Sequence, residues 1–253
     1  MSSAVDTDRW FLCRAVRPNA SVRLFCLPFA GCGASAFNTW SKVFPETVEL
    51  HAIQLPGRES RCNEPALTDA YETAKAVADA IGPYLDRRWA VFGYSMGALI
   101  AFELIRELRR RGARMPEQLF VAARSAPQLP ATHPPLAQLS REAFLEQVRY
   151  YYEPPQEAWD NPDLLEIIVP VLRADMRLCD RYVYHSEPLL ACPIHAFAGQ
   201  SDRSMPVATV QAWRAQTLGE FDLEVFNGGH FFINSALARV QEMVISRLER
   251  PME

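Results

Sequence analysis

A serine, an aspartate and a histidine occur along this chain in an order that suits nucleophilic catalysis. Ser95 is the middle residue of the sequence Gly-Tyr-Ser-Met-Gly at 93–97, which lies between apolar stretches at 89–92 and 98–105. The first stretch has the length of a buried strand, and the second has the composition of a buried helix. A Gly-x-Ser-x-Gly turn between a strand and a helix holds the serine hydroxyl at the tip of a sharp bend, at a helix N-terminus that favours negative charge. We therefore predict that Ser95 is a nucleophile.

A serine hydroxyl needs a base, and the base needs a group that orients it. His230 is the predicted base, because it follows the apolar stretch at 221–226 in a loop whose two glycines let the ring approach the end of a sheet. Asp202 is the predicted orienting acid, because it lies just past the apolar stretch at 194–198 and completes the order Ser, Asp, His of the α/β-hydrolases. The alternative for Asp202 is a local Asx-turn or the N-cap of a helix expected at 206–218.

Other residues of the same types fit these roles less well. His195 lies inside an apolar strand, where a core or sheet-face position is expected, and His185 lies at the end of a helical segment. Asp175 and Asp180 lie within a predicted helix of that segment, so they are weaker candidates for the acid.

Acyl transfer also requires two N–H donors for the negative charge that develops on the carbonyl oxygen. Met96, the residue after the nucleophile, supplies one in the strand–turn–helix arrangement. The second is expected from the loop at 28–33, which follows an early strand. Pro28 has no N–H, so the second donor is Phe29 or Ala30, and we prefer Phe29.

The predicted strands and helices alternate along the chain. The strands are expected at 22–27, 49–54, 89–92, 118–123, 193–199 and 221–226. The helices are expected at 35–43, 68–85 with Thr68 as N-cap, 98–105, 206–218 and 235–248. This alternation predicts the α/β class, with a mostly parallel central sheet and helices on both faces. We expect a single α/β-hydrolase domain over residues 1–253.

The segment 127–190 interrupts this alternation. It has a Pro-rich start, no convincing strand, and predicted helices at 140–152, near Glu157 and at 162–182. Open parallel sheets bind ligands at the carboxyl ends of their strands. We therefore predict a helical lid subdomain, inserted in the domain and placed over that edge. The alternative is a helical subdomain with no gating role.

Composition excludes several classes of function. The 253 residues carry a net charge of −4, which gives no reason to expect nucleic-acid binding. The six cysteines form no CxxC pair and do not cluster with histidines, so we expect no metal site, no cofactor and reduced thiols in a cytoplasmic protein. The polar N-terminus does not resemble a signal peptide, and the apolar stretch at 89–102 is too short to cross a bilayer, so no membrane association is expected.

Three sequence signatures are more specific than the turn at Ser95. They read CLPFAGCGAS at 26–35, QLPGRESR at 54–61, and GYSMGA at 93–98 together with GGHFF at 228–232. On these residues the chain resembles the type II thioesterases, the free-standing editing enzymes of polyketide and nonribosomal peptide synthases. The resemblance spans nearly the whole chain, and the second signature is its most diagnostic part. One departure is Cys32, where the family usually has glycine.

The resemblance implies hydrolysis of an acyl thioester on the phosphopantetheine arm of a carrier protein, which removes aberrant or stalled acyl units. Ser95 would be acylated, the thiol would leave, and water activated by His230 would release the acid. The implied partners are acyl or peptidyl carrier proteins, and we expect a monomer. The alternatives are an esterase- or lipase-like hydrolase of small esters, and a chain-releasing or cyclising thioesterase.

The helical segment contains apolar residues that would either wall an acyl chamber or form the core of the lid. They are Tyr150, Tyr151, Tyr152, Trp159, Leu164, Leu165 and Ile168.

Arginines are candidates for contact with an acidic carrier protein. One run consists of Arg106, Arg109, Arg110, Arg111 and Arg114. It lies ~16 Å or more along the helix from Ser95, so we expect it to face solvent at the far edge and to complement the helix dipole. The better candidates for docking are Arg58, Arg61, Arg149, Arg173 and Arg177.

Overall fold

The centre of the molecule is a parallel sheet of six strands in the order β2-β1-β3-β4-β5-β6. The computed structural model describes residues 7–11 and 16–249. The strands are β1 (Val22–Leu27), β2 (Val48–Ala52), β3 (Arg88–Tyr94), β4 (Gln118–Ala122), β5 (Ile194–Gly199) and β6 (Phe221–Phe226). The bounds of all six lie within two residues of the predicted strands, so the predicted α/β class is confirmed.

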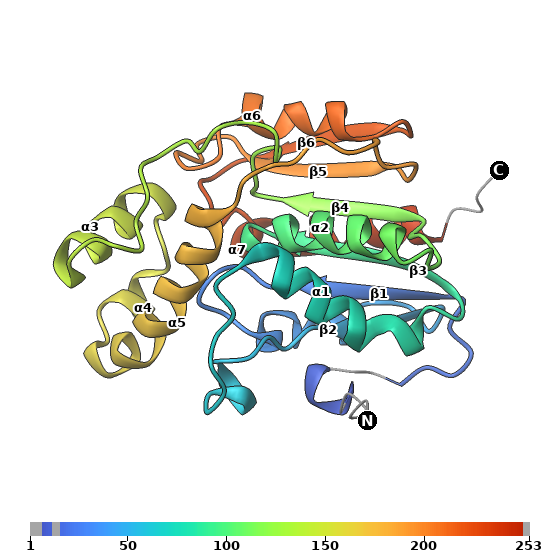
Figure 1. Cartoon of the computed structure of the whole chain (residues 1–253), viewed down its shortest axis with the longest axis horizontal. Helices are drawn as coiled ribbons and strands as arrows, with labels where there is room; N and C mark the ends of the chain where they lie inside the picture. Colours follow the sequence, from blue (N-terminus) through green and yellow to red (C-terminus); the bar gives the residue numbers. More distant parts are fainter. Residues whose placement is uncertain (1–6, 12–15, 250–253) are drawn as a thin grey trace.

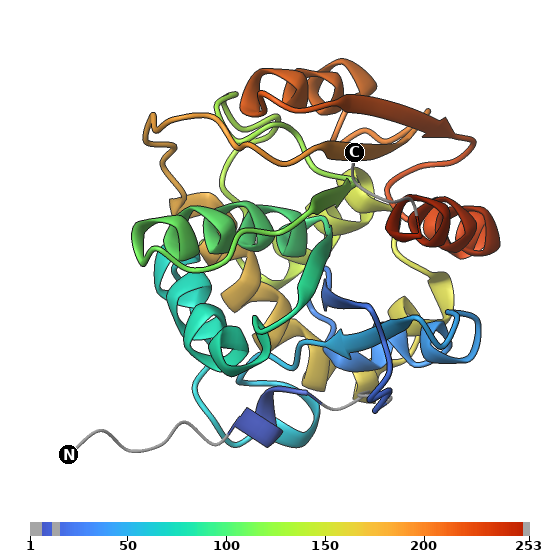
Figure 2. The same cartoon turned by 90° about the vertical axis from the view of Figure 1, so that its right-hand side faces the viewer.

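Helices cover both faces of the sheet, as the buried strands require. In β1, Phe25 and Leu27 pack into a core with α1 (Ala70–Ile81) and α2 (Met96–Arg110), whereas Leu24 and Cys26 face the opposite core with α7 (Ile233–Leu248). Figure 2 shows α1 and α2 on one side of the strands and α7 on the other. The first core also receives α6 (Val207–Gln211) and η6 (Ala212–Gln216).

The predicted helix at 35–43 is instead two 3₁₀ turns, η2 (Ala34–Phe37) and η3 (Trp40–Lys42). Ala34, Phe37 and Trp40 are all buried against the sheet, and this spacing of three residues matches the period of a 3₁₀ helix rather than that of an α-helix. The predicted helix at 206–218 is likewise divided into α6 and η6.

Helix α1 starts and ends inside the predicted range 68–85. Asp69, not Thr68, is its N-cap, because the Asp69 carboxylate accepts the N–H groups of Tyr71 and Glu72 at 2.8 and 3.0 Å. The helix ends before Pro83, which lies in η5 (Gly82–Tyr84) and has no N–H to continue it. Two further 3₁₀ turns are η1 (Thr7–Trp10) and η4 (Glu59–Arg61).

Between β4 and β5 the chain forms three α-helices. They are α3 (Arg141–Tyr152), α4 (Gln156–Trp159) and α5 (Pro162–Arg181), and they lie together at one end of the molecule (Figure 1). Ser140 caps α3 by accepting the N–H of Ala143, and Asn161 caps α5 by accepting the N–H of Leu164. Both helices therefore begin where the sequence predicts. These helices enclose a small apolar core of their own.

Three further properties concern the described part of the chain. None of its helices has both the length and the apolar character needed to cross a membrane. Five cysteines are free thiols, namely Cys26, Cys32, Cys62, Cys179 and Cys192, and Cys13 lies outside the described residues. Within residues 7–11 and 16–249, no three His, Cys, Asp or Glu side chains are grouped as metal ligands would be.

Candidate active site

The predicted nucleophile lies in a strained turn between β3 and α2. Ser95 has φ 53° and ψ −114°, a backbone conformation that side-chain-bearing residues seldom adopt. Its N–H donates to the carbonyl oxygen of Ala122 at 2.8 Å, which ties the turn to β4. The turn therefore presents the Ser95 hydroxyl at the first turn of α2, as the sequence predicts.

Both glycines of the turn are required by close backbone contacts. A Cβ on Gly93 would lie 2.4 Å from the carbonyl oxygen of Gly97, and a Cβ on Gly97 would lie 2.2 Å from the carbonyl oxygen of Leu27. Neither contact leaves space for a methyl group. Gly97 thus lets the nucleophile turn pack directly against the end of β1, where the loop 28–33 begins.

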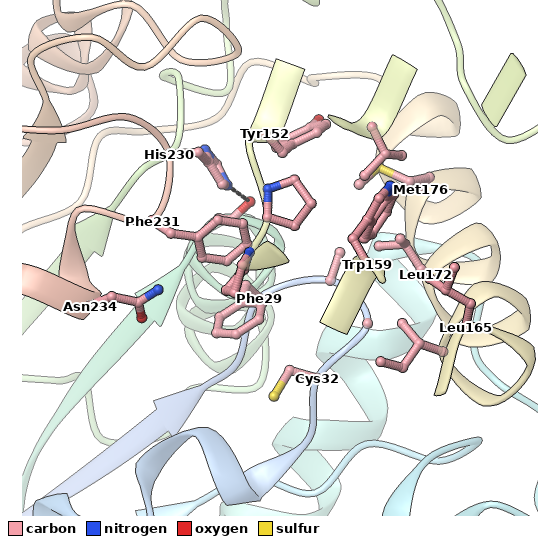
Figure 3. A pocket seen from close by; sticks show the side chains of 17 residues that line it. Phe29, Cys32, Tyr152, Trp159, Leu165, Leu172, Met176, His230, Phe231 and Asn234 are labelled. Carbon is pink, nitrogen blue, oxygen red and sulfur yellow. Dashed lines mark hydrogen bonds between the residues drawn. The ribbon is translucent and has the colours of Figure 1, made fainter. Parts of the chain in front are cut away.

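The structure brings Ser95, His230 and Asp202 together in one hydrogen-bonded chain. His230 Nε2 lies 3.0 Å from Ser95 Oγ, and His230 Nδ1 lies 2.8 Å from Asp202 Oδ2. All three residues are buried, and they follow β3, β6 and β5 respectively at the same edge of the sheet. The dashed line in Figure 3 marks the bond from His230 to Ser95. Ordinary proton transfer between Ser95 and His230 is possible at this distance.

Asp202 is held ionised by its neighbours. Its Oδ1 accepts hydrogen bonds from the N–H and hydroxyl of Ser204, at 2.9 and 2.7 Å, and from the N–H of Met205 at 3.0 Å. Burial raises the pKa of this carboxyl, but the hydrogen bonds from His230, Ser204 and Met205 outweigh burial, so the pKa lies below its ordinary value. The turn expected as the alternative role of Asp202 is therefore also present, on the oxygen that does not face His230.

Sequence reasoning missed Ser204. Its hydroxyl lies 3.0 Å from His230 Nδ1 as well as 2.7 Å from Asp202 Oδ1. Ser204 lies two residues after Asp202, and an aspartate side chain often accepts the backbone N–H two residues further on in a local turn. This spacing could have identified Ser204 from the sequence.

Two tyrosines fix the position of His230. The Tyr94 hydroxyl donates to the carbonyl oxygen of His230, and the Tyr152 ring stands edge-on to the imidazole. Tyr152 itself reaches His133, whose Nε2 lies 2.7 Å from the Tyr152 hydroxyl. The loop that carries His230 is thus held by Tyr94 of β3 and by Tyr152 of α3.

The loop 28–33 offers few free N–H donors. Within the described chain, Gly31 N–H donates to Asp175 Oδ2 at 2.8 Å, and Cys32 N–H donates to the carbonyl oxygen of Phe29 at 3.2 Å. Since Pro28 has no N–H, the N–H groups of Phe29, Ala30 and Gly33 remain, and of these three residues only Phe29 and Ala30 line the cavity beside Ser95. Met96 is the first residue of α2, so its N–H has no partner within the helix. Phe29, Ala30 and Ser95 line the same cavity.

The other candidate histidines and aspartates lie elsewhere. His195 is a buried residue of β5 that bonds Asp222 at 2.6 Å, which agrees with the expected core position, and His185 is exposed. Asp180 accepts the N–H groups of Leu136 and Ala137, both at 2.9 Å. His195 and Asp180 therefore take structural roles, whereas Asp175 contacts the loop beside Ser95.

An apolar cavity of about 250 Å³ opens beside Ser95 and His230. Figure 3 shows Trp159, Leu172 and Met176 facing Phe29 and Phe231 across it. Four of the seven predicted wall residues line the cavity, namely Tyr152, Trp159, Leu165 and Ile168. The other three, Tyr150, Tyr151 and Leu164, do not line it, and Tyr150 is exposed.

The sequence prediction of the cavity wall missed five residues of the segment 127–190, namely Val148, Pro154, Pro155, Leu172 and Met176. Leu172 and Met176 continue the stripe of Leu165 and Ile168 along one face of α5, at helical spacings of three and four residues. This periodicity was readable in the sequence and would have identified the cavity face of the helix.

The arginine run on α2 begins inside the protein. Arg106 is 1% exposed, donates to Glu103 at 2.7 Å and pairs with Glu187 at 2.9 Å. The prediction that the whole run meets solvent is therefore wrong for Arg106, because the segment that precedes β5 covers this face of α2. Arg109, Arg110 and Arg111 form their ion pairs at the surface.

Most of the arginines predicted to dock a partner are engaged within the protein. Arg58 and Arg61 are buried and ion-paired, and Arg173 donates to two backbone carbonyl oxygens at 2.8 and 2.7 Å. The prediction is wrong for these three, because each guanidinium is already satisfied by oxygen atoms of the chain. Arg149 and Arg177 are exposed on α3 and α5, and the ion pair that Arg149 forms with Asp160 at 3.3 Å lies at the surface, so both remain candidates.

Comparison with known proteins identifies the family. The model of the family described as "Thioesterase domain" matches residues 22–250. The chain belongs to the thioesterase domain family. Its sequence is 38% identical over 248 residues to the gramicidin S biosynthesis protein GrsT of Aneurinibacillus migulanus, and the match covers 98% of this chain and 97% of that protein.

Solved structures of thioesterases share the fold of this one. RedJ, the thioesterase of the prodiginine pathway in Streptomyces coelicolor, is 36% identical with a TM-score of 0.86, over 91% of this chain and 92% of its own. BorB, a type II thioesterase from the borrelidin biosynthetic cluster, is 30% identical with a TM-score of 0.88, over 98% and 100% of the two chains. The α/β-hydrolase class and the resemblance to type II thioesterases are confirmed, and the chain is a hydrolase of the thioesterase class.

Proposed function

We propose that this thioesterase hydrolyses acyl groups from the phosphopantetheine arm of acyl or peptidyl carrier proteins, and that it removes aberrant or stalled acyl units from a synthase. The observation that carries the proposal is the hydrogen-bonded chain from Ser95 through His230 to Asp202 beside an apolar cavity. Family membership supports the thioester as the bond that is cleaved. The biosynthetic settings in the names of GrsT and BorB support a synthase as the source of the substrate.

In the first half of the reaction, the Ser95 hydroxyl attacks the thioester carbonyl carbon while His230 Nε2 accepts its proton. The N–H groups of Met96 and Phe29 bind the oxyanion, and each such donor contributes ~3 kcal/mol of transition-state stabilisation in comparable sites. Collapse of the intermediate breaks the C–S bond, and His230 returns its proton to the departing thiolate. Asp202 remains ionised throughout and stabilises the imidazolium.

In the second half, water replaces the thiol. His230 Nε2 accepts a proton from the water while the oxygen attacks the acyl-serine carbonyl, and the same N–H groups bind the second oxyanion. Breaking the C–O bond to Ser95 releases the free acid, and the proton on His230 passes to Ser95 Oγ. The reaction needs no metal or cofactor in either half, because the base, nucleophile and oxyanion donors all belong to the chain.

The segment 127–190 is proposed to act as the lid of this site. Its residues Tyr152, Leu165, Ile168 and Met176 form one wall of the cavity, and the sheet loops that carry Ser95 and His230 form the other. An apolar chamber of this kind favours the acyl chain over water, since burial stabilises roughly 25 cal/mol per Å² of apolar surface. The exposed Arg149 and Arg177 on this lid are proposed contacts for an acidic carrier protein.

The proposal is tested by steady-state hydrolysis of a panel of acyl-carrier thioesters, from acetyl to long-chain, beside matched oxygen esters. We expect thioesters to be preferred and the free acid to be the product. A preference for oxygen esters would support the esterase alternative, and a cyclic or transferred product would support the chain-releasing one. Ser95→Ala is expected to abolish turnover while the protein stays folded, and a wild-type rate in this variant would refute the mechanism.

A further inference from the structure

Arg58 and Asp175 form a buried ion pair that the triad does not use. Arg58 Nη1 and Nη2 lie 2.6 and 2.7 Å from the two oxygens of Asp175, so the pair is bidentate. Their side chains are 4% and 1% exposed. Arg58 belongs to the loop after β2, and Asp175 belongs to α5, the longest helix of the lid.

Both members of this pair also hold the backbone of the loop that is proposed to bind the oxyanion. Asp175 Oδ2 accepts the Gly31 N–H at 2.8 Å, and Arg58 Nη1 donates to the Cys32 carbonyl oxygen at 3.1 Å. Gly31 has φ 80°, and Leu172 of α5 would lie 3.3 Å from a Cβ placed on it. The loop is therefore held at two points next to α5, through the N–H of Gly31 and through the carbonyl oxygen of Cys32.

These contacts determine where the neighbouring N–H groups point. A peptide unit is planar, so fixing the Gly31 N–H fixes the peptide between Ala30 and Gly31. With the end of β1 fixed on the other side, the two peptides that carry the Phe29 and Ala30 N–H groups have little freedom left. The Gly31 N–H turns toward Asp175, away from the role of an oxyanion donor.

The rest of the second sequence signature continues the same support. Gln54 Oε1 accepts the Ala34 N–H at 2.9 Å, and Gln54 Nε2 donates to the Arg58 carbonyl oxygen at 2.9 Å. Glu59 accepts the hydroxyl of Ser35 at 2.5 Å. Residues 54–59 thus bind the loop after β1 along its length, and Asp175 extends this scaffold to the lid.

We propose that Arg58 and Asp175 are positioning residues that orient the oxyanion-binding N–H groups. Through this pair, the orientation of those N–H groups depends on the packing of α5 against the sheet. The proposal rests on the function proposed above, since it presupposes an oxyanion site at Phe29 and Met96. Lifting α5 from the sheet would leave two buried charges without partners, which is strongly unfavourable. Opening of the lid is therefore confined to the part that precedes α5, which contains α3 and α4.

Two variants of the full chain test the proposal. Asp175→Asn keeps the shape of the side chain but removes its charge, and the double variant Arg58→Met with Asp175→Leu removes both charges while keeping apolar bulk. The matched controls are Glu103→Gln and the double variant Glu103→Leu with Arg106→Met, which alter a second buried Arg–carboxylate pair that does not touch the loop. Circular dichroism and thermal unfolding establish that each variant is folded.

Three ligands separate positioning from a general structural role. They are an acyl-pantetheine thioester as substrate, its thioether analogue as a ground-state mimic, and an acyl trifluoromethyl ketone, which forms a tetrahedral adduct with a reactive serine. For both Arg58/Asp175 variants we expect kcat and ketone affinity to fall in parallel, by about 10- to 100-fold, because misaimed donors lose part of their effect on the oxyanion. KM and thioether affinity are expected to stay within about 2-fold, and the controls to stay near wild type throughout.

An unchanged kcat in the Arg58/Asp175 variants would overturn the proposal. Equal losses of affinity for the thioether and for the ketone would overturn it as well. Asp175→Asn is isosteric, so it decides the question even where the double variant does not fold. Failure of the wild-type protein to hydrolyse acyl thioesters is a separate result that refutes the proposed function itself.

Discussion

The ring of Tyr152 stands edge-on to the imidazole of His230, with 4.8 Å between ring centroids and 83° between ring planes. Tyr152 is the last residue of α3, and it lines both the apolar cavity beside Ser95 and a second, more polar cavity of about 510 Å³. One side chain of α3 thus contacts the imidazole of His230 and lines two hollow regions of the protein.

Truncation of Tyr152 is expected to widen the range of acyl groups accepted. Tyr152→Ala would connect the two cavities and remove the ring contact to His230, so we expect branched or longer acyl thioesters to be accepted and kcat for the best wild-type substrate to fall about 10-fold. Tyr152→Phe keeps the ring and loses only the bond to His133, so it serves as the control. Measurement of kcat/KM over an acyl-carrier panel checks this, and an unchanged substrate preference in Tyr152→Ala would contradict it.

Asp202 and Ser204 both contact His230, but their substitution is expected to have very different effects. Asp202→Asn removes the charge that stabilises the imidazolium and alters the imidazole tautomer, so we expect kcat to fall about 10⁴-fold. Ser204→Ala removes a neutral hydroxyl and leaves the bond between Asp202 and His230 in place, so we expect a loss below about 10-fold. Single-turnover rates of acyl-enzyme formation check both values. Comparable losses in the two variants would mean that Asp202 does not act through its charge.

Gly97 and Gly82 offer a matched pair of glycine substitutions. A Cβ on Gly97 would lie 2.2 Å from the Leu27 carbonyl oxygen, whereas a Cβ on Gly82 would meet nothing within 4 Å. Gly97→Ala is therefore expected to displace the nucleophile turn from the loop after β1 and to abolish activity. Gly82→Ala is expected to leave activity unchanged, because Gly82 lies far from the active-site turn, and no gain in stability is expected, because Pro83 follows it and disfavours the helical backbone of position 82 for a residue with a Cβ. Thermal unfolding and thioester hydrolysis distinguish the two, and an active Gly97→Ala protein would show that the turn tolerates displacement.

Glu49 at the opposite end of the sheet is expected to govern part of the acid stability. Burial alone would raise its pKa, but hydrogen bonds from Arg23, from the Arg17 N–H and from His51 lower the pKa from 4.5 to about 2. Because the folded-state pKa is depressed, this contribution is complete above about pH 4.5 and is lost as the pH falls toward 2. The difference corresponds to about 3 kcal/mol.

Glu49→Gln is therefore expected to lower the free energy of unfolding by about 3 kcal/mol at pH 7 and by much less near pH 3. Urea unfolding at the two pH values measures this difference. Glu46→Gln is the control, since the Glu46 side chain is 88% exposed and pairs with Arg17 at 3.6 Å. An equal loss at both pH values would show that Glu49 stabilises the fold by its packing rather than by its charge.

The sequence predicted the strands and the three residues of the hydrogen-bonded chain because their signals are local. Each strand is marked by a short apolar run, and glycines next to Ser95 and His230 mark turns at the ends of two of these strands. The order Ser, Asp, His that is typical of the fold then assigns the three residues to one site. Helix boundaries were less accurate where packing overrides propensity. Trp40 illustrates this, because its burial one 3₁₀ period after Phe37 divides a predicted helix into two turns.

Long-range polar pairs were not predictable from the sequence. Arg58 and Asp175 are separated by 117 positions, and nothing local distinguishes them from exposed charges. Arg106 presents the same difficulty, because its burial depends on Glu187 and on a segment that returns to α2 much later in the chain. Such pairs become visible only once topology brings the segments together.

Ser95 occupies a backbone conformation that glycine adopts more easily, and a side-chain-bearing residue there costs about 1–3 kcal/mol. Glycine at this position would relieve that strain at a smaller cost in chain entropy, so the fold alone favours the inactive residue. A lineage under selection for heat resistance only would be expected to replace the serine. The strain at Ser95 is therefore explained by the proposed reaction and not by the stability of the fold.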